Sequence, residues 1–500
     1  MTSRLPLGAS GPVTVHELRS APLRDGIIAI DPLLEAVGPA DLLESADRSG
    51  WSFIIPHRPS PGVLFDDGLR AQLRLPTGDV RDLGTDPLRA LDIVAETLDI
   101  DPHATPEAGL SMPFRGGLVG ALAYELGERI QPRIDRRSND ADLPHMLLRI
   151  AGCVIAVNRE REFALVVVDE GIQRCSGAML RDELEQQCRL REFSAAADDT
   201  HRPRPTRVTT SLTHPQHVAA VETALAMIGR GDAYQINLAQ QLAAPFPHDL
   251  STLYRRMRAL SPASHAAFLP SAHLASISPE RFLEVTAGVV TTDPIKGTRR
   301  RADDPVLDAA LADDLTTSTK DRAENVMVVD LERNDLGRVC VAGSVTVPSL
   351  LELRALPTVW HLVSRVRGTL RPGTTYGDLL RATFPSGSVT GAPRLAAMQA
   401  IRALEPTPRG WYCGAVGWLG RGSASLSVAI RTATLRHGIA VYGAGGGIVA
   451  DSHPDDEVAE SLDKAVAFLS AVGATHTERR APGTVHGQPA TTVPPRPASR

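Results

Sequence analysis

Hydrophobic and polar positions along the chain follow two kinds of spacing, and each kind predicts a different element. β-Branched runs on either side of a polar turn predict β-hairpins. Apolar positions three and four residues apart predict amphipathic helices. The hairpins are expected at 153–169, 282–293 and, as a longer one, 425–445, and the helices at 217–231, 321–337 and 456–472.

The predicted strands arrive in adjacent pairs and do not alternate with helices. This order favours antiparallel sheets and an α+β fold class. Segment 194–210 has few large apolar residues and is expected to connect two parts of the chain. The predicted organisation is an N-terminal α+β region at 1–207, a C-terminal region at 208–474 and a disordered Pro- and Thr-rich tail at 475–500.

The composition is that of a globular protein with an ample core. Of 500 residues, 43% are hydrophobic and 22% are charged. The net charge of −5 provides no basic footprint, so nucleic acid is not expected as a partner. Five widely spaced cysteines without a Cys-x-x-Cys pair argue against a disulfide framework or a zinc cluster.

Nothing in the sequence predicts a membrane or secreted protein. No apolar run reaches the roughly 18 residues that a membrane helix needs. The first residues lack the continuous apolar segment of a secretory signal. A cytoplasmic location without membrane contact is therefore expected.

Carboxylates at helical spacing are the first candidate chemistry. Glu457, Glu460 and Lys464 are three and four residues apart, so they lie on one face of a helix, and Glu324 belongs to another predicted helix. Taken alone, these residues are more typical of solvated helix faces than of a metal site. Carboxylates from separate helices can also hold Mg²⁺ together with water and an anionic substrate. The spacing leaves both interpretations open.

Two glycine-rich loops are the second candidate. Gly443, Gly445, Gly446 and Gly447 follow a predicted strand, where bare backbone N–H groups can approach a carboxylate or phosphate. No Gly-Lys-Ser/Thr sequence follows, and no βαβ unit surrounds the run, which excludes a P-loop and a dinucleotide fingerprint. A plain turn remains an equal alternative. The loop at 384–394, "FPSGSVTGAPR", precedes a predicted helix and offers hydroxyl groups for an anion.

Several segments, in one order along residues 215–470, resemble the chorismate-binding enzymes, a family that includes anthranilate, aminodeoxychorismate, isochorismate and salicylate synthases. The segments are "SPERFLEV", "PIKGTR", "KDRAENVMVVDLERNDLGRV", "VWHLVSRVRG", "FPSGSVTGAPR", "YCGAVGWLG", "SVAIRTA" and "GGGIVADSHPDDEVAESLDKA". The resemblance implies an α+β fold of large antiparallel β-sheets packed as a sandwich, with helices on the outside.

The resemblance also implies chorismate as substrate, Mg²⁺ as cofactor and a set of site residues. Glu280 is expected to act as the general acid that assists departure of the C4 hydroxyl, and His361 to lie near the ring. The expected metal ligands are Glu324, Glu457 and Glu460. The residues expected to bind substrate are Thr298, Ser388, Tyr412, Arg431, Gly445, Gly447 and Lys464.

Lys296, in "DPIKGTRRR", separates branches of the family. Anthranilate synthases resemble "PIAGT" at this point, whereas aminodeoxychorismate synthases resemble "PIKGT". In that second branch the lysine attacks C2, and ammonia then adds at C4. A solvated lysine is almost entirely charged at pH 7, so a nucleophilic Lys296 requires burial or nearby cations. Three candidates for those cations follow directly, namely Arg299, Arg300 and Arg301.

The resemblance leaves the source of ammonia and the exact activity to be decided. No cysteine has the Gly-x-Cys-x-Gly context of a glutaminase nucleophile, so a separate glutamine amidotransferase subunit is expected. The expected activity is that of aminodeoxychorismate synthase component I, for p-aminobenzoate and folate or a related pathway. The alternatives are an anthranilate or aminodeoxyisochorismate synthase, an isochorismate or salicylate synthase, and a non-catalytic chorismate-binding subunit.

Overall fold

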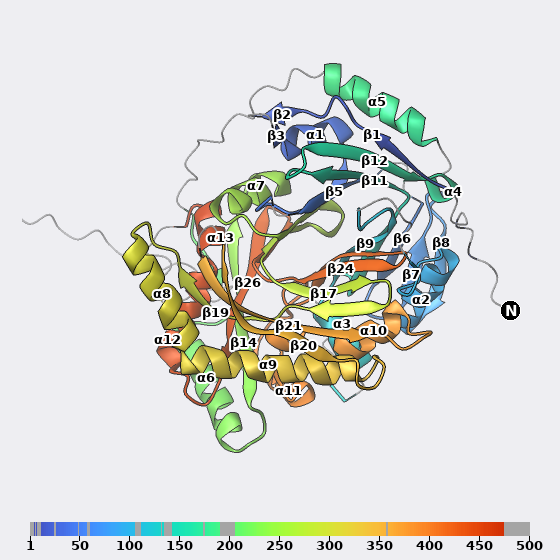
Figure 1. Cartoon of the computed structure of the whole chain (residues 1–500). Coiled ribbons are helices and arrows are strands. Elements are labelled where there is room, and N and C mark those ends of the chain that lie inside the picture. The colour runs from blue at the N-terminus through green and yellow to red at the C-terminus, as the bar shows by residue number, and fades with distance from the viewer. Residues whose placement is uncertain are drawn as a thin grey trace, which may run out of the picture.

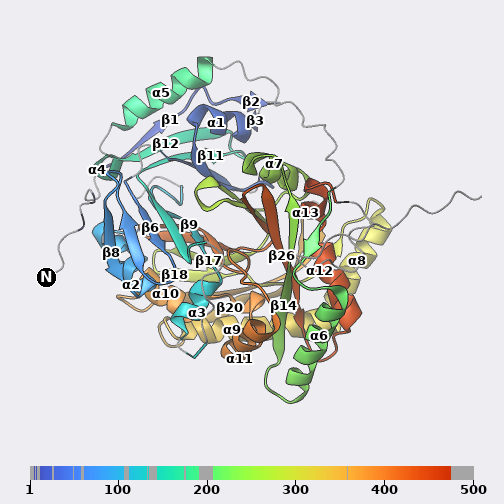
Figure 2. The same cartoon turned by 180° about the vertical axis from the view of Figure 1, so that it is seen from behind.

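Two large antiparallel β-sheets form the centre of the molecule, and helices cover their outer faces (Figures 1 and 2). The structure is a computed structural model. It describes residues 5, 7, 12–24, 27–48, 50–57, 61–105, 112–131, 133–134, 143–173, 176–190, 206–356 and 359–474. Within these ranges, no helix is long and apolar enough to cross a membrane. The predicted tail at 475–500 and most of the predicted connector at 194–210 lie outside the described residues.

The first sheet joins strands from both ends of the chain. Strand β15 pairs with β4, so an element after residue 208 continues a row of N-terminal strands. In spatial order the sheet contains β1 (Val13–Glu17), β12 (Phe163–Asp169), β11 (Cys153–Asn158), β5 (Trp51–Pro56), β4 (Ala40–Glu44), β15 (His265–Leu269), β16 (Leu274–Ser278), β25 (Thr432–Arg436), β26 (Ile439–Ile448), β14 (Gln235–Pro245) and β13 (Thr209–Thr210), with β22 (Gly391–Ala392) paired to β14.

The second sheet also combines strands from both parts of the chain, because β23 pairs with β9. In spatial order it contains β19 (Ile295–Arg300), β21 (Val359–Thr369), β18 (Val289–Thr292), β17 (Arg281–Thr286), β24 (Ser423–Val428), β23 (Ala415–Gly420), β9 (Gly117–Leu122), β10 (Met146–Ala151), β6 (Val63–Asp66), β7 (Ala71–Arg74) and β8 (Val80–Gly84), with β20 (Thr346–Ala355) paired to β21. The predicted boundary at residue 208 therefore stays a prediction about chain order, since both sheets contain strands from either side of it.

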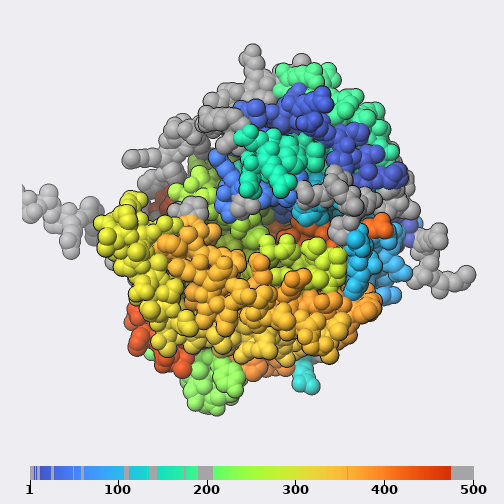
Figure 3. Space-filling view, in the orientation of Figure 1, coloured from blue at the N-terminus to red at the C-terminus, as the bar shows by residue number. Residues whose placement is uncertain are grey.

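The helices lie on the outer faces of the sheets, and a small ribbon of β2 (Leu23–Arg24) and β3 (Ile27–Ile28) lies apart. They are α1 (Ile30–Val37), α2 (Pro87–Thr97), α3 (Glu125–Ile130), α4 (Glu170–Gln173), α5 (Gly177–Leu190), α6 (His214–Gly229), α7 (Leu250–Leu260), α8 (Pro305–Thr317), α9 (Thr319–Gly337), α10 (Tyr376–Thr383), α11 (Arg394–Leu404), α12 (Pro454–Lys464) and α13 (Val466–Ala471). In the space-filling view, the yellow to orange surface of α8, α9 and β20 lies below the blue to teal surface of the N-terminal strands (Figure 3).

Apolar side chains from the inner faces of both sheets form a shared core. Phe53 of β5 packs edge-on against Trp418 of β23 and Phe114, with ring centroids 6.2 and 5.5 Å apart. Val154 of β11 and Val119 of β9 are fully buried in the same cluster. Since each sheet supplies one side of this core, the expected α+β sandwich with outer helices is confirmed.

Two of the three predicted hairpins form as expected, and the third does not. Strands β11 and β12 pair directly, and so do β17 and β18. The segment at 425–445 does not form the one long hairpin that we expected, because only its second part, β25 with β26, is a hairpin. Its first part is β24 in the second sheet, while β25 and β26 pair in the first sheet. The chain crosses between sheets at Arg431, whose φ of +50° lies in the left-handed region.

Candidate active site

Glu280, Ser388 and Lys296 form the centre of the candidate site. The Lys296 ammonium donates to the backbone oxygen of Ser388 at 3.3 Å. The hydroxyl of Ser388 and the backbone N–H of Ile295 are hydrogen-bonded to the buried carboxyl of Glu280. Burial raises the pKa of Glu280, and the Ser388 bond and the Lys296 charge offset only part of that rise. The structure thus brings the predicted acid and the predicted nucleophile to one serine.

The backbone around Lys296 departs from a regular strand. The pairing of β19 with β21 shifts register between Ile295 and Thr298. Gly297 has a φ of +84°, and a Cβ there would lie 2.7 Å from Leu315 of α8. Only glycine fits such a bulge without strain. The bulge interrupts the simple alternation of faces and directs Lys296 toward the loop of Ser388.

The arginines that follow Lys296 are not a run of free positive charge. Arg299 pairs with Asp314 at 2.6 Å and with Asp321 at 3.1 Å. Arg301 pairs with Asp308 at 2.8 Å. Both guanidiniums therefore fasten β19 to α8 and α9. The expected electrostatic help from these two arginines is not favoured by this geometry, because each is already neutralised by a carboxylate.

Glu280 and Lys296 flank the hairpin predicted at 282–293, but their own segments are not paired with each other. Strand β17 follows Glu280 and pairs with β18, but β21 lies between β18 and β19. A tertiary contact brings the two residues together, namely the bond from the Ile295 N–H to the Glu280 carboxyl. Local hairpin pairing therefore does not account for their proximity.

His361 lies on β21 beside β19. Its Nδ1 is 3.5 Å from the hydroxyl of Thr298, a contact at the outer limit of hydrogen bonding. Burial, helped by the charge of Arg431, lowers the pKa of His361 to about 4, so the imidazole is neutral at pH 7. Within the described residues its Nε2 is buried and has no hydrogen-bond partner. Arg431 itself donates to the Ser261 hydroxyl at 3.3 Å.

The predicted metal ligands come from two helices, Glu324 from α9 and Glu457 and Glu460 from α12. Lys320 lies between two of them, 4.0 Å from Glu324 and 3.7 Å from Glu457. Glu457 also accepts from the Ser452 hydroxyl at 2.6 Å. Burial raises the pKa of Glu324, and the charges of Lys296 and Lys320 oppose this. The same two helices thus hold carboxylates and a lysine in one cluster.

Glu460 completes the cluster together with Lys464. The Lys464 ammonium lies 2.8 Å from Glu460 and donates to the Gly445 oxygen at 3.0 Å. Burial alone would raise the pKa of Glu460, but Lys464 outweighs it and holds that pKa below its usual range. A Cβ on Gly446 would lie 3.1 Å from Glu457, so a bare strand is needed at this point. Gly446 belongs to the site beside the predicted Gly445.

The carboxylate cluster suits a hard cation that keeps part of its water. Among the side chains that the structure describes, no three acidic, histidine or cysteine groups form a ready-made metal centre. The three carboxylates nevertheless surround two ammonium groups, so the cluster already favours positive charge. Mg²⁺ binds through one or two carboxylates, several waters and an anionic substrate. The donor set therefore fits that ion.

Tyr412 packs on the face of the glycine strand β26 that is opposite to the carboxylates, and Gly447 faces that same side of the strand. The Tyr412 ring covers Gly443, where a Cβ would be 2.2 Å from the ring. The Gln235 amide likewise covers Gly447, and its nitrogen is buried without a hydrogen-bond partner among the described residues. Sequence reasoning missed Gln235, although it lies in the segment "DAYQINLAQQL". An unpartnered buried donor beside the glycine run is a candidate contact for substrate.

An acid on α9 anchors the Ser388 loop, and sequence reasoning missed this too. Glu332 accepts from the Gly387 N–H at 3.1 Å and from the Ser386 hydroxyl at 3.2 Å. Burial raises the pKa of Glu332, and the neighbouring Asp335 adds to the rise. Asp335 forms a buried ion pair with Arg394 at the end of the same loop. Glu332 and Asp335, three residues apart on α9, thus hold the two ends of the loop.

The lysine content carries a signal that is visible only once the site is known. The chain contains three lysines, Lys296, Lys320 and Lys464, among 53 lysines and arginines. All three lie in this site. An arginine cannot replace a nucleophilic amine, because its guanidinium stays protonated. In such an arginine-rich chain, each lysine marks a position worth testing.

A cleft lies between the two sheets, next to the candidate site. Its volume is about 490 Å³, and His361, Asp293 and Arg365 line the side nearest the site. The far side is lined by Glu44 and Ser45, part of the segment "LLESA". Because His361 also belongs to the candidate site, the cleft adjoins that site.

Comparison with known proteins agrees with the geometry. A family model described as chorismate binding enzyme matches residues 61–470. The aminodeoxychorismate synthase component 1 of Salmonella typhimurium is 36% identical over 386 residues, covering 76% of this chain and 81% of the relative. The anthranilate synthase component 1 of Mycobacterium tuberculosis (strain H37Rv) is 36% identical over 459 residues, covering 87% and 88%.

A solved structure has the same architecture. Anthranilate synthase component I from Streptococcus pneumoniae superimposes with a TM-score of 0.72 at 29% identity, covering 84% of this chain and 92% of that one. The family match extends over most of the chain and includes every residue of the candidate site. This chain therefore belongs to the family of chorismate-binding enzymes.

Proposed function

We propose that the chain is the chorismate-aminating component of an aminodeoxychorismate synthase. It converts chorismate and ammonia into 4-amino-4-deoxychorismate and water. The observation that carries this proposal is the position of Lys296, which shares Ser388 with the buried acid Glu280. An amine and a protonated carboxyl on one serine can act on two carbons of the same ring.

The reaction divides into two displacements. In the first, the Lys296 nitrogen forms a bond to C2, the ring double bonds shift, and the C4–O bond breaks. The leaving hydroxide takes the proton of Glu280 and departs as water. In the second, ammonia forms a bond to C4, the double bonds shift back, and the C2–N bond breaks. Lys296 leaves as its free amine, and the ammonium formed at C4 gives one proton back to Glu280, which restores both groups.

The environment of Glu280 suits a general acid. Hydroxide is a poor leaving group, so a proton must accompany it. Burial raises the pKa of Glu280, which keeps a larger share of its carboxyl protonated near neutral pH. Activity that requires this proton should decline as pH rises above that pKa.

We also propose that Glu324, Glu457 and Glu460 hold Mg²⁺. When bound, this ion would neutralise a carboxylate of chorismate. Lys320 and Lys464 balance the acidic cluster in the structure. Gly446 faces this cluster without a side chain, and a Cβ there would lie 3.1 Å from Glu457.

The proposal includes a glutamine amidotransferase partner as the source of ammonia. The relatives at 36 to 38% identity include chains named component 1, which implies a second component in those systems. Cys413 is buried, and burial raises the pKa of its thiol to about 12, so it is unsuited to serve as a glutaminase nucleophile. Ammonium should therefore support the reaction without glutamine.

The test is to incubate the purified chain with chorismate, Mg²⁺ and ammonium, with and without an added aminodeoxychorismate lyase. The expected product is 4-amino-4-deoxychorismate, and p-aminobenzoate once the lyase is present. Lys296→Ala should lower the rate at least about a thousandfold, since it removes the nucleophile. Arg300→Ala is the matched control on the same strand, because Arg300 is exposed, and it should stay within about twofold.

Other outcomes would contradict the proposal in distinct ways. Fluorescent anthranilate as the main product would identify direct amination at C2. Turnover of chorismate without any ammonia source would identify addition of water or lyase chemistry. Full activity in Lys296→Ala and Glu280→Gln would remove the basis for the covalent mechanism.

A further inference from the structure

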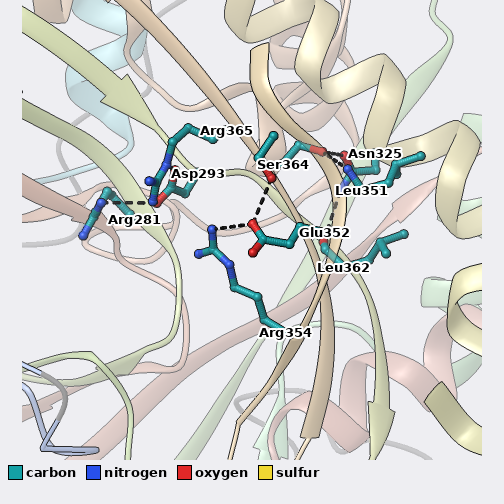
Figure 4. A network of polar contacts seen from close by, with 10 residues as sticks. Arg281, Asp293, Asn325, Leu351, Glu352, Arg354, Leu362, Ser364 and Arg365 are labelled. Carbon is teal, nitrogen blue, oxygen red and sulfur yellow. Dashed lines mark hydrogen bonds and ion pairs between the residues drawn. The ribbon is translucent and has the colours of Figure 1, made fainter.

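A buried carboxylate, Asp293, lies between two arginines immediately behind the site (Figure 4). Arg365 of β21 donates to both of its oxygens, at 2.7 and 2.8 Å. Arg281 of β17 donates to one of them at 3.2 Å. We call Asp293, Arg281 and Arg365 the arginine clamp. Two-pronged bonds between a guanidinium and a carboxylate fix orientation as well as distance.

The arginine clamp joins the chain neighbours of the two central residues. Arg281 directly follows Glu280, and Asp293 comes three residues before Lys296. A second connection lies beside the arginine clamp, where the Ile295 N–H donates to the Glu280 carboxyl. The segments of the acid and the amine are therefore crosslinked twice within a few residues. No hairpin joins them, because β21 lies between β18 and β19.

The same strand links the arginine clamp to the carboxylate cluster. Beside Arg365, the Ser364 N–H donates to the Pro294 oxygen at 3.1 Å. The Ser364 hydroxyl donates to Asn325, whose amide donates to the Leu362 oxygen at 3.1 Å (Figure 4). Asn325 directly follows Glu324 on α9. One network thus reaches the neighbours of the acid, the amine and a metal-site carboxylate.

We infer that Asp293 is a positioning residue that holds Glu280 and Lys296 in register for the two displacements. Its carboxylate accepts from the guanidiniums of Arg281 and Arg365. Its effect acts through Arg281 on one segment and through Pro294 and Ile295 on the other. A displacement of about 1 Å between catalytic groups costs on the order of a hundredfold in rate. The inference rests on the proposed function.

The test compares Asp293→Asn with the wild-type enzyme in the chorismate and ammonium reaction. Asparagine keeps the size but lacks the negative charge, and it replaces one of the two accepting oxygens with an NH2 group that faces a guanidinium donor. We expect kcat to fall at least tenfold, while KM for chorismate changes less than threefold. Glu352→Gln is the matched control, because Glu352 forms an exposed ion pair with Arg354 in the same region. Its kcat should stay within twofold.

Arg365→Met provides a second route, because Arg365 is about one-third exposed and its loss is easier for the fold to tolerate. It should lower kcat in the same way, and adding Asp293→Asn should cost less than the product of the two single effects. A kcat within twofold of wild type for folded Asp293→Asn or Arg365→Met would overturn the inference. So would a loss confined to KM. A wild-type enzyme without C4 amination would instead refute the proposed function.

Discussion

Two buried acid–arginine groups lie on either side of the site, and their charges are balanced in opposite ways. The arginine clamp places one carboxylate between two guanidiniums. The second group, which we call the acid pair, places Glu332 and Asp335 around one guanidinium, that of Arg394. Both hold backbone segments that carry predicted site residues. They differ in whether positive or negative charge is in excess.

The difference decides the protonation of each group. Burial alone would raise the pKa of Asp293, but the bonds from Arg365 and the charge of Arg281 bring it below its usual range. In the acid pair, burial and mutual repulsion raise the pKa of Glu332, and Arg394 cannot offset both. A buried carboxylate stays ionised where nearby cations and hydrogen-bond donors outweigh the cost of its desolvation. Asp293 in the arginine clamp is therefore ionised, whereas the acid pair retains a proton on Glu332.

Removing the ion-paired guanidinium of the acid pair should have the largest effect on stability. Arg394→Met leaves two buried carboxyls with only the exposed Arg338 acting on Asp335, and we expect a loss of about 3–5 kcal/mol in the free energy of unfolding. Urea denaturation at pH 7 measures it. Arg381→Met is the control, because Arg381 forms an exposed ion pair with Asp86 and should cost less than about 1 kcal/mol. Equal losses in the two variants would contradict the comparison.

Glu332→Gln should change how stability depends on pH. The folded pKa of Glu332 is raised, so above about pH 4.5 the unfolded chain ionises first, and the free energy of unfolding falls as pH rises toward the folded pKa. The variant lacks this loss. Relative to wild type it should gain up to about 1.4 kcal/mol per pH unit between pH 5 and 8.

In Asp293→Asn, the free energy of unfolding relative to wild type should change with pH in the opposite direction. The folded pKa of Asp293 is lowered, so its stabilisation is present above the unfolded pKa and is lost as pH falls through the folded value. The variant should therefore be most destabilised near pH 7 and approach wild type in acid. Slopes of the same sign for the two variants would show that the acid pair is ionised.

The smallest expected effect is on the serine between the acid and the amine. Ser388→Ala removes a hydrogen bond that lowers the pKa of Glu280, so that pKa rises further. The decline of kcat/KM at alkaline pH should move upward by roughly one pH unit or less. Ser388→Thr keeps the hydroxyl and serves as the control. A downward shift in Ser388→Ala would show that Glu280 does not supply the proton.

Sequence reasoning located individual helices better than the long-range arrangement of the chain. Local periodicity located α9 and α12, and spacing placed Glu457, Glu460 and Lys464 on one face. It failed at 425–445, where a chain crossing between sheets looks like a continuous β segment. It also failed to find Glu332, whose partners Ser386 and Gly387 lie more than fifty residues away. Long-range pairings leave no periodic trace.

The sequence by itself determined the chemistry available to this protein: one lysine in "PIKGT", an acid in "SPERF" and carboxylates at helical spacing. Only the tertiary structure decided how these act together. It showed that Arg299 and Arg301 are neutralised by α8 and α9, and that a bulge at Gly297 directs Lys296 toward Ser388. Residue type and spacing set what a side chain can do. Burial and the charges brought near it from distant segments set whether it is protonated and what it reaches.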